Sequence, residues 1–230
     1  MPAHLRREIE NLKKEILTCG AIAEQSVRNA TRAIEHRDEA LARGVIEKDI
    51  NLDQMEVEVE ESCLKILALY QPVAIDLRFI IAVLKINNDL ERVGDLAVNI
   101  AERAMFLATQ PEVNVELDFT TMAVKTQEML KKSLDALVNF NAGLAREVCA
   151  CDDEIDAMNR QMYLTVQDAM NTHPDQIEPL THLLSASRHL ERIADHATNI
   201  AEDVIYMIEG EIVRHKTEEY QTRTKTSKVN

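Results

Sequence analysis

A segment rich in polar side chains occurs twice in this chain. Residues 90–102 read LERVGDLAVNIAE and residues 190–202 read LERIADHATNIAE, a spacing of 100 with nine of thirteen positions identical. The shared polar residues are a Glu, an Arg, an Asp, an Asn and a second Glu. A repeat of this length indicates two copies of one structural unit. Because polar side chains are repeated as well as apolar ones, we expect each copy to carry its own site.

On a helix, which turns by about 100° per residue, the repeated oxygen-bearing side chains fall within an arc of about 80°. In the first copy they are Glu91, Asp95, Asn99 and Glu102. In the second copy they are Glu191, Asp195, Asn199 and Glu202. Apolar residues of each segment, such as Val93 and Ile100, fall on roughly the opposite side. Each helix is therefore predicted to have one face in the core and another edged with carboxylate and amide oxygens.

A second pair of carboxylates precedes each copy, four residues apart and so on one helical face. The pairs are Asp49 with Asp53 and Asp152 with Asp156. If the two helices of each copy pack antiparallel, their acidic faces converge into one cluster of oxygens. Like charges this close favour a bound cation, and oxygen ligands suit magnesium, manganese, calcium or ferric iron. The pattern favours a metal or ligand site, and the alternative is an ordinary solvated acidic face.

Long helices must position these residues, because the chain has few residues that interrupt helices. It contains five Gly and five Pro in 230 residues, and 3% of the chain is aromatic. Amphipathic patterning predicts helices at about 2–36, 38–70, 73–108, 119–146, 151–171 and 175–209. The expected architecture is all-α, either two tandem antiparallel three-helix bundles or one merged six-helix bundle. We place the first repeat at 1–110, a linker at 111–118, the second repeat at 119–209 and a flexible polar tail at 210–230.

Charge and hydropathy exclude several classes of protein. The formal net charge is −14, and an acidic surface repels phosphate backbones, so direct binding of nucleic acid is not expected. No run approaches the roughly 18 apolar residues of a membrane span. The charged amino-terminal stretch also lacks the apolar centre of a signal peptide. We therefore expect a cytoplasmic protein.

The histidines argue against a di-iron oxidase. Such bundles use Glu-x-x-His pairs, and none of the seven histidines has an acidic residue three positions before it. His182, His189 and His196 form a stripe spaced by seven, which lies away from the carboxylate arc and is too extended to hold one ion. A polar border or a helix–helix contact is predicted for this stripe. Phosphate-binding loops, dinucleotide fingerprints and recognisable nucleophile settings are missing as well.

Three segments of the first half resemble the PhoU family of phosphate-transport regulators. They are QPVAIDLR at residues 71–78, DLERVGD at 89–95 and NIAE at 99–102. In the second half ERIAD at 191–195 is retained, whereas the counterpart of QPVAIDLR is degraded. The resemblance covers residues 1–210 as two repeats, and it implies two three-helix bundles related by pseudo-two-fold symmetry.

The resemblance also implies metal clusters and partners. The implied ligand pairs are Asp49 with Asp53, Glu91 with Asp95, Asp152 with Asp156, and Glu191 with Asp195. The implied role is to restrain phosphate uptake and the phosphate-starvation response, by contacting the ATPase of the phosphate ABC transporter and a membrane sensor histidine kinase, commonly as a homodimer. The leading hypothesis is a non-enzymatic adaptor with multinuclear metal on its acidic faces. The alternatives are a metal-dependent enzyme acting on a phosphorylated substrate and a purely structural scaffold.

Overall fold

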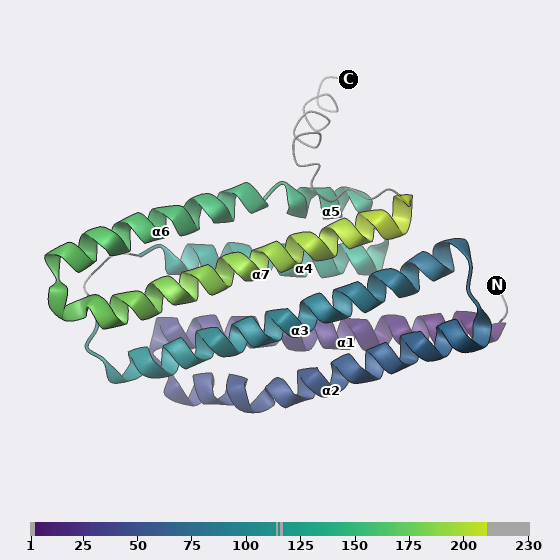
Figure 1. Ribbon diagram of the computed structural model, residues 1–230, viewed down its shortest axis with the longest axis horizontal. Coiled ribbons are helices and arrows are strands. Elements are labelled where there is room, and N and C mark those ends of the chain that lie inside the picture. The colour runs from purple at the N-terminus through teal and green to yellow at the C-terminus, as the bar shows by residue number, and fades with distance from the viewer. Residues whose placement is uncertain (1–2, 114, 116, 211–230) are drawn as a thin grey trace, which may run out of the picture.

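The protein is all-α over the residues described by the computed structural model, which are 3–113, 115 and 117–210 (Figure 1). The helices are α1 (Ala3–His36), α2 (Glu39–Tyr70), α3 (Ala74–Thr109), α4 (Phe119–Asn139), α5 (Ala142–Cys149), α6 (Asp152–Thr172) and α7 (Ile177–Glu209), and a 3-10 turn, η1 (Pro174–Gln176), precedes α7. The predicted fold class is confirmed. Apart from Gly210, which ends α7 with φ 75°, the tail predicted at 210–230 lies outside the described residues.

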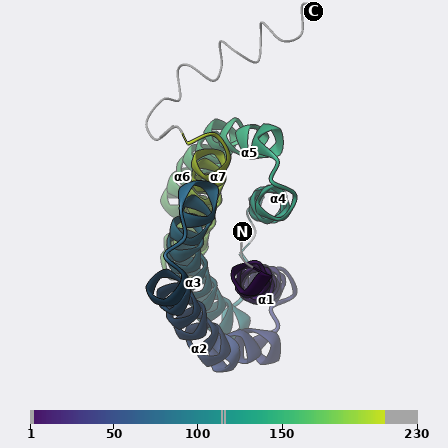
Figure 2. The same ribbon diagram turned by 90° about the vertical axis from the view of Figure 1, so that its right-hand side faces the viewer.

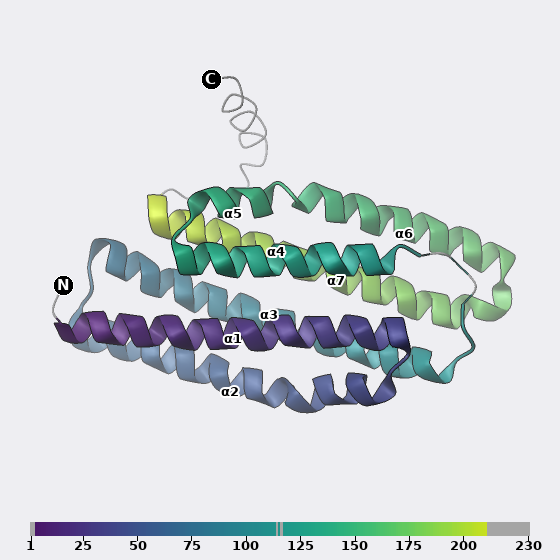
Figure 3. The same ribbon diagram turned by 180° about the vertical axis from the view of Figure 1, so that it is seen from behind.

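Two antiparallel three-helix units pack side by side. The first unit is α1–α3, and the second is α4–α7, in which α5 and α6 together take the place of α2. In the end view, α2, α3, α7 and α6 form one curved layer, and α1 with α4 lies against its concave side (Figure 2). Seen from behind, α1 and α4 run in front of that layer (Figure 3). The sequence left two bundles or one merged bundle open, and the structure shows two units joined over a shared core.

The core joins the units mainly where α3 lies against α7, with a smaller contact between α1 and α4. It is built from Leu, Ile, Val, Ala and Met side chains contributed by both units. Val93 and Ile100 on α3 are fully buried, as are Ile193 and Ile200 at the matching positions of α7. The predicted apolar faces opposite the carboxylates are therefore confirmed. Among the described helices none is both long and apolar enough to cross a bilayer.

The first turn of each unit has the same construction. Arg37 and Phe140 adopt left-handed backbone conformations, with φ 53° and 51°. The next residue, Asp38 or Asn141, caps the following helix by accepting a hydrogen bond from a backbone N–H three residues on, at 2.9 Å and 3.0 Å. Such caps satisfy N–H groups that have no partner within the helix.

This turn corrects one predicted helix. The amphipathic pattern predicted a single helix over 119–146, but α4 ends at Asn139 and α5 begins at Ala142. The polar cap at Asn141 starts a new helix there. In the second unit α5 ends at Cys149 and α6 begins at Asp152, whereas α2 of the first unit is one uninterrupted helix. The apolar periodicity persists across the turn because α4 and α5 face the same core, so periodicity alone does not show the break.

Candidate metal sites

The first carboxylate cluster forms where α2 packs against α3. Asp49 and Asp53 come from α2, and Glu91 and Asp95 come from α3. Burial, followed by the negative charges of Asp53 and Asp95, raises the pKa of Asp49 to about 6. The pKa of Glu91 is also raised, by burial first and then by Asp95, while Arg92 opposes the shift. The charges that act on Asp49 and Glu91 come from both helices, so the four carboxylates lie within electrostatic range of one another where α2 meets α3. We call this set the first cluster.

The second cluster repeats this arrangement between α6 and α7. Burial raises the pKa of Asp195 to about 6, followed by the charges of Asp152, Glu191 and Asp156. The pKa of Asp152 is raised by burial, against a hydrogen bond that its Oδ1 accepts from the Thr198 hydroxyl at 3.1 Å. Both clusters therefore combine a carboxylate pair from the middle helix of a unit with a pair from its last helix.

The repeated asparagines border these clusters. The Asn99 side chain donates from Nδ2 to the backbone carbonyl of Asp95, at 2.8 Å. The amide nitrogen of Asn99 is thus bonded to its own helix, and the amide oxygen does not take part in this bond. The oxygen is the atom that a hard cation would bind. Asn199 occupies the matching partly buried position on α7.

The chemistry of the donor set fits a hard cation. Every predicted ligand offers an oxygen atom, and several negative charges are gathered in each cluster. Among the described residues, no three His, Cys, Asp or Glu side chains are arranged to hold one ion. Asp53 and Asp95 are exposed at the protein surface, so core packing does not hold their side chains in one position. Binding would require these side chains to turn towards the ion, which would neutralise the repulsion between the carboxylates.

Comparison with known proteins identifies the repeat. The sequence matches the PhoU domain twice, over residues 16–104 and 119–204. The chain belongs to the PhoU family. Each PhoU domain contains one complete carboxylate cluster, from the middle helix to the last helix of its unit.

Relatives share almost the whole length of the chain. A phosphate-specific transport system accessory protein PhoU homolog of Clostridium acetobutylicum is 36% identical over 90% of this chain and 94% of its own length. The homolog of Aquifex aeolicus is 38% identical over 92% and 96%. The crystal structure of PhoU from Pseudomonas aeruginosa superimposes with a TM-score of 0.87 at 36% identity, covering 90% of this chain and 99% of that one. That of the phosphate transport system regulatory protein PhoU from Streptococcus pneumoniae gives 0.82 at 29% identity, covering 91% of this chain and 99% of that one.

Close packing at Gly94 brings the two helices of the first PhoU domain together. A Cβ atom at this position would overlap Leu52 Cδ2 and lie 3.2 Å from Asp49 Oδ1. Gly94→Ala should therefore lower the free energy of unfolding by about 1–3 kcal/mol, because the buried Leu52 side chain must move. Leu52→Val should restore part of the loss. Urea unfolding of the two single variants and the double variant measures both effects.

Gly44→Ala provides the matched control, since a Cβ at Gly44, also within a helix of the first PhoU domain, would meet nothing within 4 Å. Helix propensity alone should make this variant more stable by about 0.5–1 kcal/mol. An equal stabilisation by Gly94→Ala would contradict the close approach of α2 and α3.

Burial of the carboxylates, and then their crowding, gives the metal-free PhoU fold a pH dependence. The folded-state pKa values of Asp49 and Asp195, about 6 in each case, exceed the ordinary value of 3.8. The contribution of these two groups to the free energy of unfolding is therefore fully present below about pH 4, and it is lost as the pH rises through about 6. Asp49→Asn and Asp195→Asn should each stabilise the metal-free protein at pH 7.5. Both carboxylates are partly solvated, so we expect about 1 kcal/mol for each.

Urea unfolding in EDTA at pH 4 and pH 7.5 checks this prediction. The advantage of each Asn variant over the wild type should be present at pH 7.5 and absent at pH 4. An advantage of the same size at both pH values would show that it does not come from titration of the carboxylate.

The histidine stripe makes helix–helix contacts, as predicted for this PhoU sequence. The His182 ring stacks on Phe106 with centroids 3.8 Å apart, and His196 Nδ1 lies 2.8 Å from Asp89 Oδ1. Both contacts join α7 to α3. His189 is partly buried on the same helix, and burial followed by the charge of Arg103 lowers its pKa to about 4.

Sequence reasoning missed three contributors to the clusters. Glu56 adds a negative charge beside Glu91, Thr198 donates to Asp152, and Gly94 permits the close packing of α2 on α3. Glu56 could have been predicted from the sequence, because it lies about one helical turn beyond Asp53 and so on the same face of the helix. The roles of Thr198 and Gly94 depend on the packing of two helices.

Proposed function

We propose that this protein is a cytoplasmic, non-enzymatic regulator of phosphate uptake and phosphate-starvation signalling. The observation that carries the proposal is similarity over about nine-tenths of the chain, with 36% and 38% identity, to proteins named as phosphate-specific transport system accessory proteins. In this proposal the protein acts as a homodimer, restrains the ATPase of the phosphate ABC transporter and contacts a membrane sensor histidine kinase.

The carboxylate clusters would hold multinuclear metal in this role. The ligands would be Asp49, Asp53, Glu91, Asp95 and Asn99 in the first unit, and Asp152, Asp156, Glu191, Asp195 and Asn199 in the second. A hard cation there would supply positive charge on an otherwise acidic surface and an attachment point for phosphate or for an acidic group of a partner. Iron, manganese, magnesium and calcium all suit this oxygen-rich donor set.

The second cluster offers further support for recognition of an anionic group. A groove of about 370 Å³ beside it is lined by Arg160 and Arg188 together with Asp156 and Glu191. Guanidinium groups bind phosphate and carboxylate in a bidentate manner. The positions matching these arginines in the first unit are Val57 and Asn88, so the two faces differ in what they present to a partner.

Exposure of the carboxylates favours an adaptor over an enzyme. A metal-dependent enzyme acting on a phosphorylated substrate calls for a pocket that excludes water around the reacting group. Asp53 and Asp95 are exposed at the surface instead. Such a surface is accessible to a macromolecular partner.

The proposal is tested in cells that lack the protein, by measuring phosphate uptake and by co-purification with the native transporter. The wild-type protein should restore restraint of uptake and capture the transporter ATPase. A variant with Asp49, Asp53, Glu91 and Asp95 replaced by their amides should do neither at the same cellular level. Unchanged uptake with and without the wild-type protein would overturn the regulatory role, and phosphoester turnover that requires Glu91 would favour the enzyme.

A further inference from the structure

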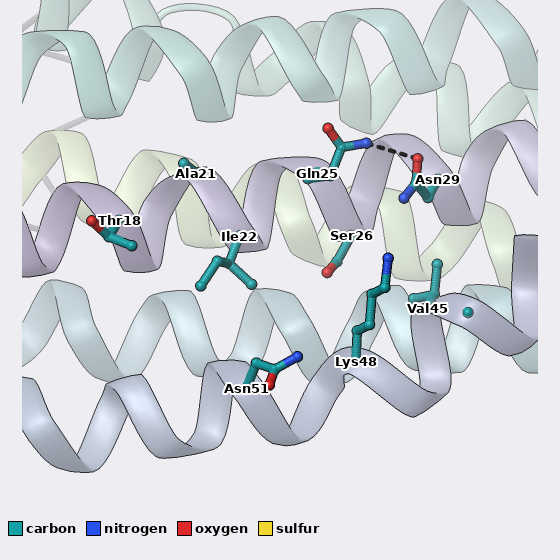
Figure 4. A pocket seen from close by; sticks show the side chains of 10 residues that line it. Thr18, Ala21, Ile22, Gln25, Ser26, Asn29, Val45, Lys48 and Asn51 are labelled. Carbon is teal, nitrogen blue, oxygen red and sulfur yellow. Dashed lines mark hydrogen bonds between the residues drawn. The ribbon is translucent and has the colours of Figure 1, made fainter.

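A groove of about 540 Å³ lies between α1 and α2, outside both carboxylate clusters (Figure 4). This volume is typical of sites that bind small organic molecules. Ten residues line it, and none of these is a carboxylate. The whole chain carries 40 Asp and Glu against 26 Lys and Arg, so an acid-free groove of this size differs from the average surface of the protein.

One end of the groove presents hydrogen-bond donors and a positive charge. The Lys48 side chain extends from α2 towards Ser26 on α1 (Figure 4). Lys48 forms no ion pair with a described residue. Gln25 Nε2 donates to Asn29 Oδ1 at 2.7 Å, which leaves the Asn29 amide nitrogen on the side of Ser26 and Lys48 (Figure 4). An ammonium, a hydroxyl and an amide N–H can all donate hydrogen bonds to a phosphate group.

The opposite end is less polar. The Ile22 side chain projects into the groove, and Asn51 of α2 faces it (Figure 4). An apolar surface with a neutral amide beside it suits the uncharged body of a ligand. The groove thus separates a place for an anionic group from a place for the remainder of a small molecule.

Gly44 provides an independent observation at the same groove. It lies inside α2, where Gly is less favourable than Ala by about 0.5–1 kcal/mol, and a Cβ there would meet nothing within 4 Å. Helix packing therefore gives no reason for the glycine, whereas a larger side chain would extend into the groove. At the spacing of 103 that relates Asp49 to Asp152, the second unit has Glu147 and Cys151 in place of Gly44 and Lys48.

We propose that the groove between α1 and α2 binds a small organic phosphate ester. The phosphate group contacts Lys48, Ser26 and Asn29, and the organic part lies against Ile22. The second unit has Glu147 and Cys151 at the matching positions and so lacks the cation, which makes the site specific to the first unit. The inference does not depend on the regulatory role or on bound metal.

The test is protein-observed NMR on the full ¹⁵N-labelled chain in EDTA, which removes any contribution from metal in the clusters. The ligands are AMP, ribose 5-phosphate and glycerol 3-phosphate. Each is compared with its two separated halves, which are inorganic phosphate and adenosine, ribose or glycerol, respectively. At least one ester should shift the amide signals around Lys48 and Ser26 in a saturable manner, and more tightly than either half alone.

Variants locate the site. Lys48→Gln should weaken binding of the ester by about tenfold, as expected for loss of one charge-assisted contact, and Gly44→Gln should block it. Lys131→Gln makes the same change of charge at an exposed position on α4 and should have no effect. The amide spectrum of each variant confirms that it is folded.

Three results would overturn the proposal. One is the absence of saturable shifts with all three esters, and another is tighter binding of inorganic phosphate than of any ester. The third is equal weakening by Lys48→Gln and Lys131→Gln, which would indicate general attraction of anions and not a site.

Discussion

Ile100→Ala and Ile200→Ala should each lower the free energy of unfolding by about 2–5 kcal/mol. The two side chains are 0% exposed and occupy matching positions on α3 and α7. Truncation removes buried methyl groups and leaves a cavity that packed helices only partly fill. Because α3 and α7 also join the two units, the loss is expected to affect the whole molecule.

Denaturant unfolding followed by circular dichroism measures this effect. Since the units share one core, each variant should show a single transition, shifted as a whole. Ile50→Ala is the control, because Ile50 on α2 is 60% exposed and its truncation should change stability by about 0.5 kcal/mol or less. Two separate transitions, each sensitive to only one of the buried substitutions, would mean that the units fold independently.

A divalent cation should reverse the effect of the crowded carboxylates. At a free concentration of 100 times Kd, each occupied site stabilises the folded protein by about 2.7 kcal/mol. We therefore expect Mn²⁺ to raise the stability of the wild-type protein strongly. The increase in the free energy of unfolding caused by Mn²⁺ should lose the contribution of the first cluster in the double variant Asp49→Asn/Asp95→Asn. It should lose that of the second cluster in Asp152→Asn/Asp195→Asn. The increase should vanish in the variant that combines all four substitutions.

The control for this measurement is Asp168→Asn, an exposed position on α6 about three turns beyond Asp156. It removes one negative charge without touching a cluster, so it should keep the full response to Mn²⁺. The cluster variants should also be more stable than the wild type in EDTA at pH 7.5. A response to Mn²⁺ that survives in the combined variant would place the cation elsewhere.

The faces of the helices were predictable from the sequence because helical geometry is regular. The carboxylates at Glu91 and Asp95 and the apolar side chains at Val93 and Ile100 fall on opposite sides in any helix of normal pitch. The same regularity predicted the stripe of His182, His189 and His196 as a contact between helices, which the stacking of His182 on Phe106 confirms.

Details of helix ends and helix packing were less predictable. The break after Asn139 depends on a left-handed Phe140, a residue type that gives no signal for this conformation. Periodicity also does not tell whether two bundles merge, since the same apolar faces serve either arrangement. The groove at Lys48 brings together residues from two helices, so the facing of α1 and α2 had to be known first.

The metal content of the purified protein tests the central claim, that the paired carboxylates of each PhoU domain form a cation site. The wild-type protein, Asp95→Ala and Asp195→Ala are purified from metal-replete cells and compared by elemental analysis per mole of chain. Stoichiometric metal is expected in the wild type. Asp95→Ala should lack the metal bound at the first cluster, and Asp195→Ala should lack the metal bound at the second. Equal, near-zero metal in all three proteins would contradict the account.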